Sequence, residues 1–197
     1  EVSGFAELRA EQFSPEVARR YRRGQIRATL SQSKFLLLGN LFIAPIFASQ
    51  ALMNGPVLLI LAWTITMMVV SVVLFLWTKS LQKTTGEASD MARVKLRALI
   101  DGSTWAAGMA CIYPFATGDG KVIIGVIMTG AVALGTFGYA RAAGPALIYL
   151  ACTALGSGLV GFVTGLVTGS YVHLFLLPLA IFAFIVLAES VRSLGKG

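Results

Sequence analysis

The sequence predicts an all-α fold: a polytopic membrane bundle of six transmembrane helices with both termini in the cytoplasm. Three observations favour this class. Hydrophobic residues make up 56 % of the chain and charged residues only 13 %. The mean hydropathy is +0.79. The apolar residues also form six separate runs, most of them close to the roughly 20 residues that a helix needs to cross a bilayer. The net charge of +7 is therefore assigned to the two sides of a membrane, and we expect no nucleic-acid partner.

The six predicted spans together form a transmembrane module over residues 35–188. Their expected bounds are 35–52, 57–77, 98–116, 122–139, 145–167 and 172–188. Glycine, proline and charged residues separate them, as expected of turns at the ends of membrane helices. The connections on one side are only four or five residues long, so we expect no ligand-binding domain on that side.

The placement of lysine and arginine gives the expected orientation. Fifteen of the sixteen basic residues fall on one side if the N-terminal segment, the connection over residues 78–97, the turn at Arg141 and the tail face the cytoplasm. Only Lys121 falls on the other side. Because cytoplasmic loops carry an excess of lysine and arginine, both termini are predicted to be cytoplasmic. We expect a multi-pass protein of the bacterial inner membrane.

Residues 1–34 are predicted to form a basic cytoplasmic pre-helix. Ser14-Pro15-Glu16 is a favourable helix start, with a capping side chain, proline in the first turn and an acid near the positive helix end. Five arginines follow: Arg19, Arg20, Arg22, Arg23 and Arg27. They either contact an anionic lipid surface, at about 1 kcal/mol each, or only fix the topology, and the second interpretation is favoured.

Small residues recur in the fourth and fifth predicted spans. Ten of the 21 glycines lie between residues 125 and 169. The small residues predicted to mediate helix packing are Ala131, Gly135 and Gly138 in one span and Gly158, Gly161 and Gly165 in the next. Their spacing of three or four residues places each set on one helix face, which allows close approach of helices in lipid. We therefore expect these two stripes to face each other in an antiparallel hairpin.

Residues 189–197 are expected to begin a cytoplasmic output helix. Leu187, Val191 and Leu194 have the spacing of a coiled-coil seam. This spacing predicts a homodimer in which two copies of the emerging helix meet along these residues.

No catalytic, cofactor or metal site is predicted. Ser157 and His173 resemble a serine–histidine dyad in composition only. Ser157 lies roughly 16 Å below the outer end of its helix at 1.5 Å per residue. His173 lies at the outer start of the next helix, too far away to act as the base of Ser157. A single histidine does not provide a haem or metal ligand set. Cys111 and Cys152 have no metal-ligand spacing and are interpreted as buried apolar side chains.

Polar residues within the spans suggest one further site. Asn40, Asp101 and Trp105 are candidates for an intramembrane polar site. Asp101 and Glu189 are both expected near cytoplasmic helix ends, which leaves no span with a central acid or base. Since proton-coupled transporters usually carry such a residue, the sequence disfavours a transporter.

Three motifs resemble the six-helix N-terminal membrane regions of bacterial diguanylate cyclases and related cyclic-di-GMP signalling proteins; similar regions precede some histidine kinases. The motifs are Leu37-Leu38-Gly39-Asn40 after a basic helix, the segment 101–105 after an Arg-rich helix, and the small-residue span 129–139 followed by Gly144-Pro145. No Gly-Gly-Asp/Glu-Glu-Phe signature is present in these residues.

The resemblance implies a membrane-embedded sensory, anchoring and dimerisation module coupled to a C-terminal diguanylate cyclase domain, with a small hydrophobic or membrane-borne ligand as a possible partner. Whether the parent protein is an enzyme, a cyclase or a phosphodiesterase, is left open. Two further functions remain compatible with the sequence: a small channel or carrier, and a passive membrane anchor.

Overall fold

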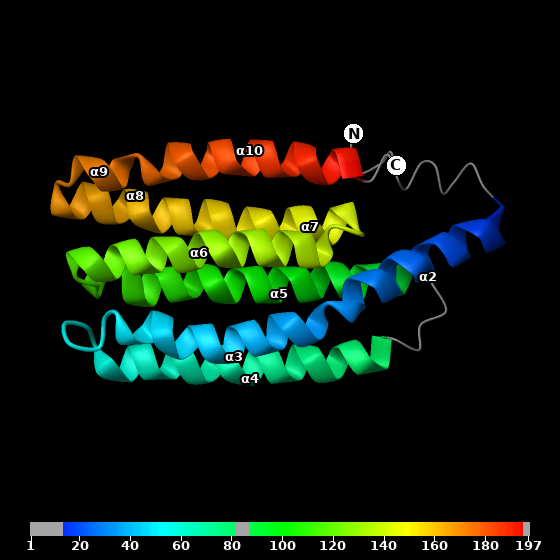
Figure 1. Cartoon of the computed structure of the whole chain (residues 1–197), viewed down its shortest axis with the longest axis horizontal. Helices are drawn as coiled ribbons and strands as arrows, with labels where there is room; N and C mark the ends of the chain where they lie inside the picture. Colours follow the sequence, from blue (N-terminus) through cyan, green and yellow to red (C-terminus); the bar gives the residue numbers. More distant parts are fainter. Residues whose placement is uncertain (1–13, 82–86, 195–197) are drawn as a thin grey trace.

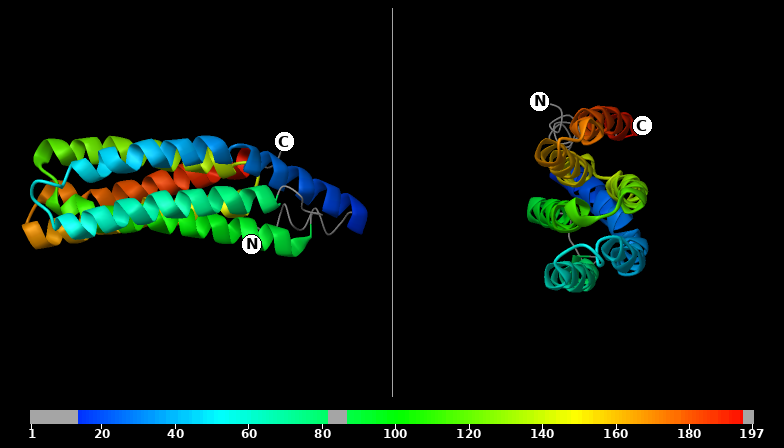
Figure 2. Two further views of the ribbon diagram at one scale, coloured as in Figure 1. Left: turned by 90° about the horizontal axis from the view of Figure 1, so that it is seen from below. Right: turned by 90° about the vertical axis from the view of Figure 1, so that its left-hand side faces the viewer.

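The computed structural model describes residues 14–81 and 87–194, which form one all-α bundle (Figure 1). Its helices run side by side along a common direction, with α4 and α10 at opposite sides of the bundle (Figures 1 and 2). The helices are α2 (Pro15–Ser31), α3 (Ser33–Ser49), α4 (Val57–Leu81), α5 (Ala88–Ile112), α6 (Gly118–Tyr139), α7 (Ala143–Leu150), α8 (Gly156–Thr168), α9 (Tyr171–Leu174) and α10 (Leu176–Leu194), with short η1 (Tyr113–Phe115) and η2 (Ala151–Leu155).

Five helical segments are long and apolar enough to cross a membrane. They are Pro15–Ser49, Val57–Leu81, Gly118–Tyr139, Ala143–Thr168 and Tyr171–Val191. The segment Ala143–Thr168 joins α7 and α8 through the π-helical turn η2. The sixth long helix, α5, contacts α4, α7 and α8. The chain is therefore a multi-pass helical membrane protein.

Helix α5 begins ten residues before the predicted start of the third span. It starts at Ala88 after a capping box, in which the side chains of Glu87 and Asp90 each accept a hydrogen bond from the backbone N–H of the other residue. The sequence pattern predicts that the apolar span starts near residue 98, because charged residues precede it. The earlier start puts Asp101 near the middle of the 25-residue helix, so the expectation that Asp101 lies near a helix end is wrong.

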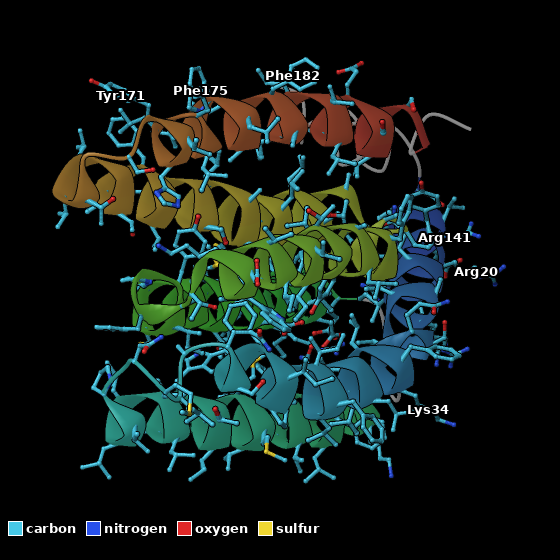
Figure 3. All side chains as sticks on the ribbon, turned by 60° about the vertical axis from the view of Figure 1, so that its left-hand side comes forward. Arg20, Lys34, Arg141, Tyr171, Phe175 and Phe182 are labelled. Atoms are coloured by element: carbon cyan, nitrogen blue, oxygen red, sulfur yellow. The ribbon has the colours of Figure 1, made fainter. Side chains whose placement is uncertain are left out.

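The basic pre-helix and the first span are nearly continuous. Only Gln32 separates α2 from α3, and α2 extends past the end of the bundle (Figure 2, left). Ile26 and Leu30 of α2 are fully buried, in a cluster with Leu81, Met91 and Val94. This cluster holds the C-terminal half of α2 against α4 and α5. Arg20, Lys34 and Arg141 lie at this same end of the bundle (Figure 3).

The two small-residue stripes do not face each other. A Cβ atom at Gly135 would meet the ring of Tyr149 on α7, and one at Gly138 would lie 3.3 Å from Leu36 on α3. Ala131 is buried, and its carbonyl accepts a hydrogen bond of 2.9 Å from Oη of Tyr149. The first stripe therefore accommodates a tyrosine ring on one side and a leucine on the other.

The second stripe packs against the last helices of the chain. A Cβ at Gly158 would meet Ala180, one at Gly161 would meet Leu176, and both of these residues belong to α10. A Cβ at Gly165 would lie 3.0 Å from His173 and Leu174 of α9. The predicted pairing of the two stripes is wrong, because the glycines of α8 make room for α9 and α10 instead of for α6.

Helix α10 packs inward at its C-terminal end. Val191 is only 2 % exposed and belongs to the main apolar core of the chain, and Leu187 packs beside Leu150 and Ala188. The side chain of Leu194 lies outside the described residues. A dimer seam through Val191 would require this packing to open. Tyr171 of α9, Phe175 between α9 and α10, and Phe182 of α10 point outward (Figure 3) and are suited to contact lipid.

Candidate functional site

Four helices meet at a buried group of polar side chains, which we call the polar centre: Asn40, Ser71, Arg97, Asp101 and Tyr139. Nδ2 of Asn40 on α3 donates to Oγ of Ser71 on α4 at 3.1 Å and to Oδ1 of Asp101 on α5 at 3.3 Å. Oη of Tyr139 on α6 lies 3.5 Å from Oδ2 of Asp101. Asp101 therefore links α3, α5 and α6, and Asn40 adds α4.

Arg97 supplies a second buried ionisable group, one turn before Asp101 on α5. The residue is 2 % exposed, and its guanidinium carbon lies 5.7 Å from the centroid of the Tyr139 ring. This is the geometry of a cation–π contact. Within the described part of the chain, Nε and Nη1 of Arg97 have no hydrogen-bond partner. Unpaired polar groups in a low-dielectric interior cost free energy. The Arg97 side chain is therefore expected to change its position when the hydrogen bonds of Asp101 change.

A cavity of about 460 Å³ lies beside the polar centre. Helix α3 provides much of its wall and α6 a further large part, and α5 and α7 contribute one residue each. The lining residues are Gln32, Phe35, Leu36, Gly39, Asn40, Ile43, Trp105, Ala131, Leu134, Phe137, Gly138 and Tyr149. Phe35, Leu134 and Phe137 are exposed at the bundle surface, so the cavity opens towards the lipid-facing side of α3 and α6. We call it the lateral pocket.

Aromatic packing supports the inner wall of the lateral pocket. The rings of Trp105 and Phe47 stand edge to face at 5.7 Å, and Trp63 lies 6.2 Å from Trp105. Nε1 of Trp63 donates to the carbonyl of Thr104 at 2.9 Å. A Cβ at Gly108 would collide with the Trp63 indole. These contacts hold Trp105 in place, which gives the pocket a rigid aromatic wall.

Two of the three residues predicted to form a polar site make direct contact. Asn40 and Asp101 are joined by a hydrogen bond, and Trp105 lines the adjacent pocket together with Asn40. Sequence reasoning missed Arg97, Ser71 and Tyr139. The four-residue spacing between Arg97 and Asp101 is a signal for a shared helix face, but Arg97 was assigned to the polar connection before the span that starts at residue 98.

The remaining candidates do not form a reactive site. Oγ of Ser157 and Nδ1 of His173 are buried and lack hydrogen-bond partners among the described residues. The His173 ring instead packs edge to face on Tyr113 at 5.7 Å. No cluster of three or more possible metal ligands occurs in the described ranges 14–81 and 87–194. Of the predicted surface arginines, Arg19, Arg20, Arg23 and Arg27 are exposed on α2 and Arg22 is half-buried.

Comparisons with known proteins identify no relative: no protein-family model, no curated protein and no solved structure matches this chain. The lateral pocket is a mainly apolar binding volume with two amides in its lining, Gln32 and Asn40. The amide of Asn40 belongs to the polar centre and is hydrogen-bonded to α4 and α5.

Proposed function

We propose that this chain is a membrane-embedded sensory, anchoring and dimerisation module of a bacterial signal-transduction protein. The observation that carries the proposal is the position of Asn40, which lines the lateral pocket and is also hydrogen-bonded to α4 and α5. A molecule that contacts Asn40 would change the hydrogen bonds of Asp101. Ligand binding would then alter the relative stability of two helix arrangements, as a sensor requires.

Packing provides a physical connection from the polar centre to the last helix. The rings of Tyr139 and Tyr149 lie 5.6 Å apart, and both belong to the same apolar core as Val191 of α10. Helix α7, which carries Tyr149, also contacts α10. A change at Asp101 would move Tyr139 and its neighbours, and α10 would carry that change to the end of the bundle.

The proposed output is a cytoplasmic catalytic domain, in keeping with the resemblance to the membrane regions of diguanylate cyclases. Reading the gene beyond the codon for Gly197 tests this proposal. We expect an output domain in frame after α10, carrying a Gly-Gly-Asp/Glu-Glu-Phe signature or a kinase core. A stop codon directly after this segment would contradict the signalling proposal. Homodimerisation remains part of the proposal. Val191 is buried within its own chain, so the dimer contact is made by other residues.

The proposed orientation places both termini in the cytoplasm of a bacterium. It is supported by the concentration of basic residues at one end of the bundle, where Arg20, Lys34 and Arg141 lie (Figure 3). Asn54 and Arg141 are exposed at connections on opposite ends. A cysteine at position 54 should react with an impermeant thiol reagent added outside the cell, and one at position 141 should not. The reverse labelling would contradict the orientation.

A carrier is the second candidate function, and one observation favours it over a channel or a passive anchor. Asp101 is a buried carboxylate in the middle of α5, which is the kind of residue that proton-coupled carriers use. Proteoliposomes containing the chain distinguish a carrier from a sensory module. A carrier would accumulate a solute in response to a proton gradient, whereas a sensory module would leave the solute distribution unchanged.

A further inference from the structure

The side-chain amide of Asn40 has an uneven set of hydrogen bonds. An amide offers two N–H donors and a carbonyl acceptor. Both donors are used, towards Ser71 and Asp101. Among the described residues, no group donates a hydrogen bond to Oδ1 of Asn40. Nε and Nη1 of Arg97 also have no partner among these residues, but they are fully buried, whereas Oδ1 of Asn40 remains accessible. The amide therefore presents an acceptor, and no free donor, at the wall of the lateral pocket.

The remaining wall of the pocket selects for an apolar, ring-containing molecule. Phe35, Phe137, Trp105 and Tyr149 contribute aromatic surface from four different helices. The O–H donor of Tyr149 is already used, because it donates to the carbonyl of Ala131. Gly39 leaves open space where a side chain would stand, since no atom lies within 4 Å of a Cβ built there. The pocket thus combines stacking surfaces with the free acceptor of Asn40, and Gln32, between α2 and α3, adds a second amide to the lining.

We propose that the lateral pocket binds a membrane-soluble aromatic or cyclic alcohol, whose hydroxyl group donates a hydrogen bond to Oδ1 of Asn40. The ligand enters from the lipid through the gap between α3 and α6, and its ring lies between the aromatic side chains. A ketone or ether of the same shape offers only acceptors and so makes no hydrogen bond with this oxygen. The proposal concerns binding alone. It rests on the proposed sensory function only for the role that this binding plays in the cell.

Two probes of the same shape test the donor requirement. 2-Naphthol carries a hydroxyl donor, and 2-methoxynaphthalene replaces it with an ether. Binding to the purified chain in detergent is followed by the rise in Tm with probe concentration, because a ligand that binds only the folded state stabilises it. One hydrogen bond of ordinary strength corresponds to about a tenfold difference in affinity. We therefore expect 2-naphthol to bind about tenfold more tightly than 2-methoxynaphthalene.

Three variants locate the binding site. Gly39→Leu fills the pocket and should weaken binding of both probes at least tenfold. Gly125→Leu is the matched control, because Gly125 on α6 also has open space around its Cβ position but does not line the pocket. It should bind both probes like the wild type. Asn40→Leu should lose the preference for the hydroxyl. If this variant does not fold, the comparison of Gly39→Leu with Gly125→Leu still decides whether the pocket is the site.

Two results would overturn the inference. Equal affinities of the wild type for the two probes would contradict the donor requirement. Equal effects of both probes on wild type and Gly39→Leu, including no effect on either, would show that the pocket is not their site. Neither result depends on movement of α10. The sensory proposal is tested separately by that movement, so the two can fail independently.

Discussion

Replacing Gly135 by alanine should destabilise the bundle by about 1–3 kcal/mol, the usual cost of forcing an extra carbon into a filled contact. The added Cβ would collide with the ring of Tyr149. That ring cannot easily move away, because it is 2 % exposed and its hydroxyl is hydrogen-bonded to Ala131 at 2.9 Å. Unfolding in a titration with sodium dodecyl sulfate, followed by helical circular dichroism, gives the change in free energy.

Gly130→Ala is the matched control on the same helix. Nothing lies within 4 Å of a Cβ at Gly130, and alanine favours the helix over glycine by up to about 1 kcal/mol. This variant should be as stable as the wild type or more stable. If both alanine variants unfold together with the wild type, Gly135 does not make the close contact with Tyr149 on which the wall of the pocket depends.

Removing the amide at position 40 should have the second large effect. Asn40→Leu leaves Oδ1 of Asp101 without a side-chain donor among the described residues, and an unsatisfied buried group costs about 1–3 kcal/mol, or more when it is charged. We expect this loss of stability in the same titration, whereas Phe42→Leu, at a 71 % exposed position two residues further on α3, should change little.

A double-mutant cycle separates the hydrogen bond from other effects of these changes. Asp101→Leu alone leaves Asn40 short of an acceptor, while the double variant removes both polar partners. The double variant should therefore be less destabilised than the sum of the single variants, by about 0.5–3 kcal/mol. Strictly additive losses would show that Asn40 and Asp101 do not stabilise the bundle through their mutual hydrogen bond.

The assignment as a membrane protein and most helix bounds follow from the sequence, because hydropathy and helix-breaking residues depend on local composition alone. The spans around α4, α6 and α10 illustrate this: their apolar runs end at glycine, proline or charged residues. The predicted third span starts ten residues after the first residue of α5, because Asp90, Arg93, Lys95 and Arg97 interrupt the apolar pattern. In the fold they form a helix whose Arg97 is buried against Tyr139.

Contacts between residues of different helices were less predictable than the face of a helix on which a residue lies. The spacing of Gly135 and Gly138 indicates a face with small residues, but no local pattern tells whether a glycine makes room for another backbone or for a tyrosine ring. Similarly, Val191 has the spacing of a dimer seam, yet its partners lie in its own chain. Asn40 and Asp101 were candidates as isolated polar residues. Their contact depends on how α3 and α5 are placed.

The central claim is that the polar centre controls the position of α10. Spin labels on cysteines at Ser80 of α4 and Ser190 of α10, both exposed, report the distance across the bundle by pulsed electron resonance once Cys111 and Cys152 are replaced by alanine. Asn40→Leu should shift this distance distribution relative to the wild type, and Phe42→Leu should leave it unchanged. A folded Asn40→Leu protein with the wild-type distribution would contradict the claim.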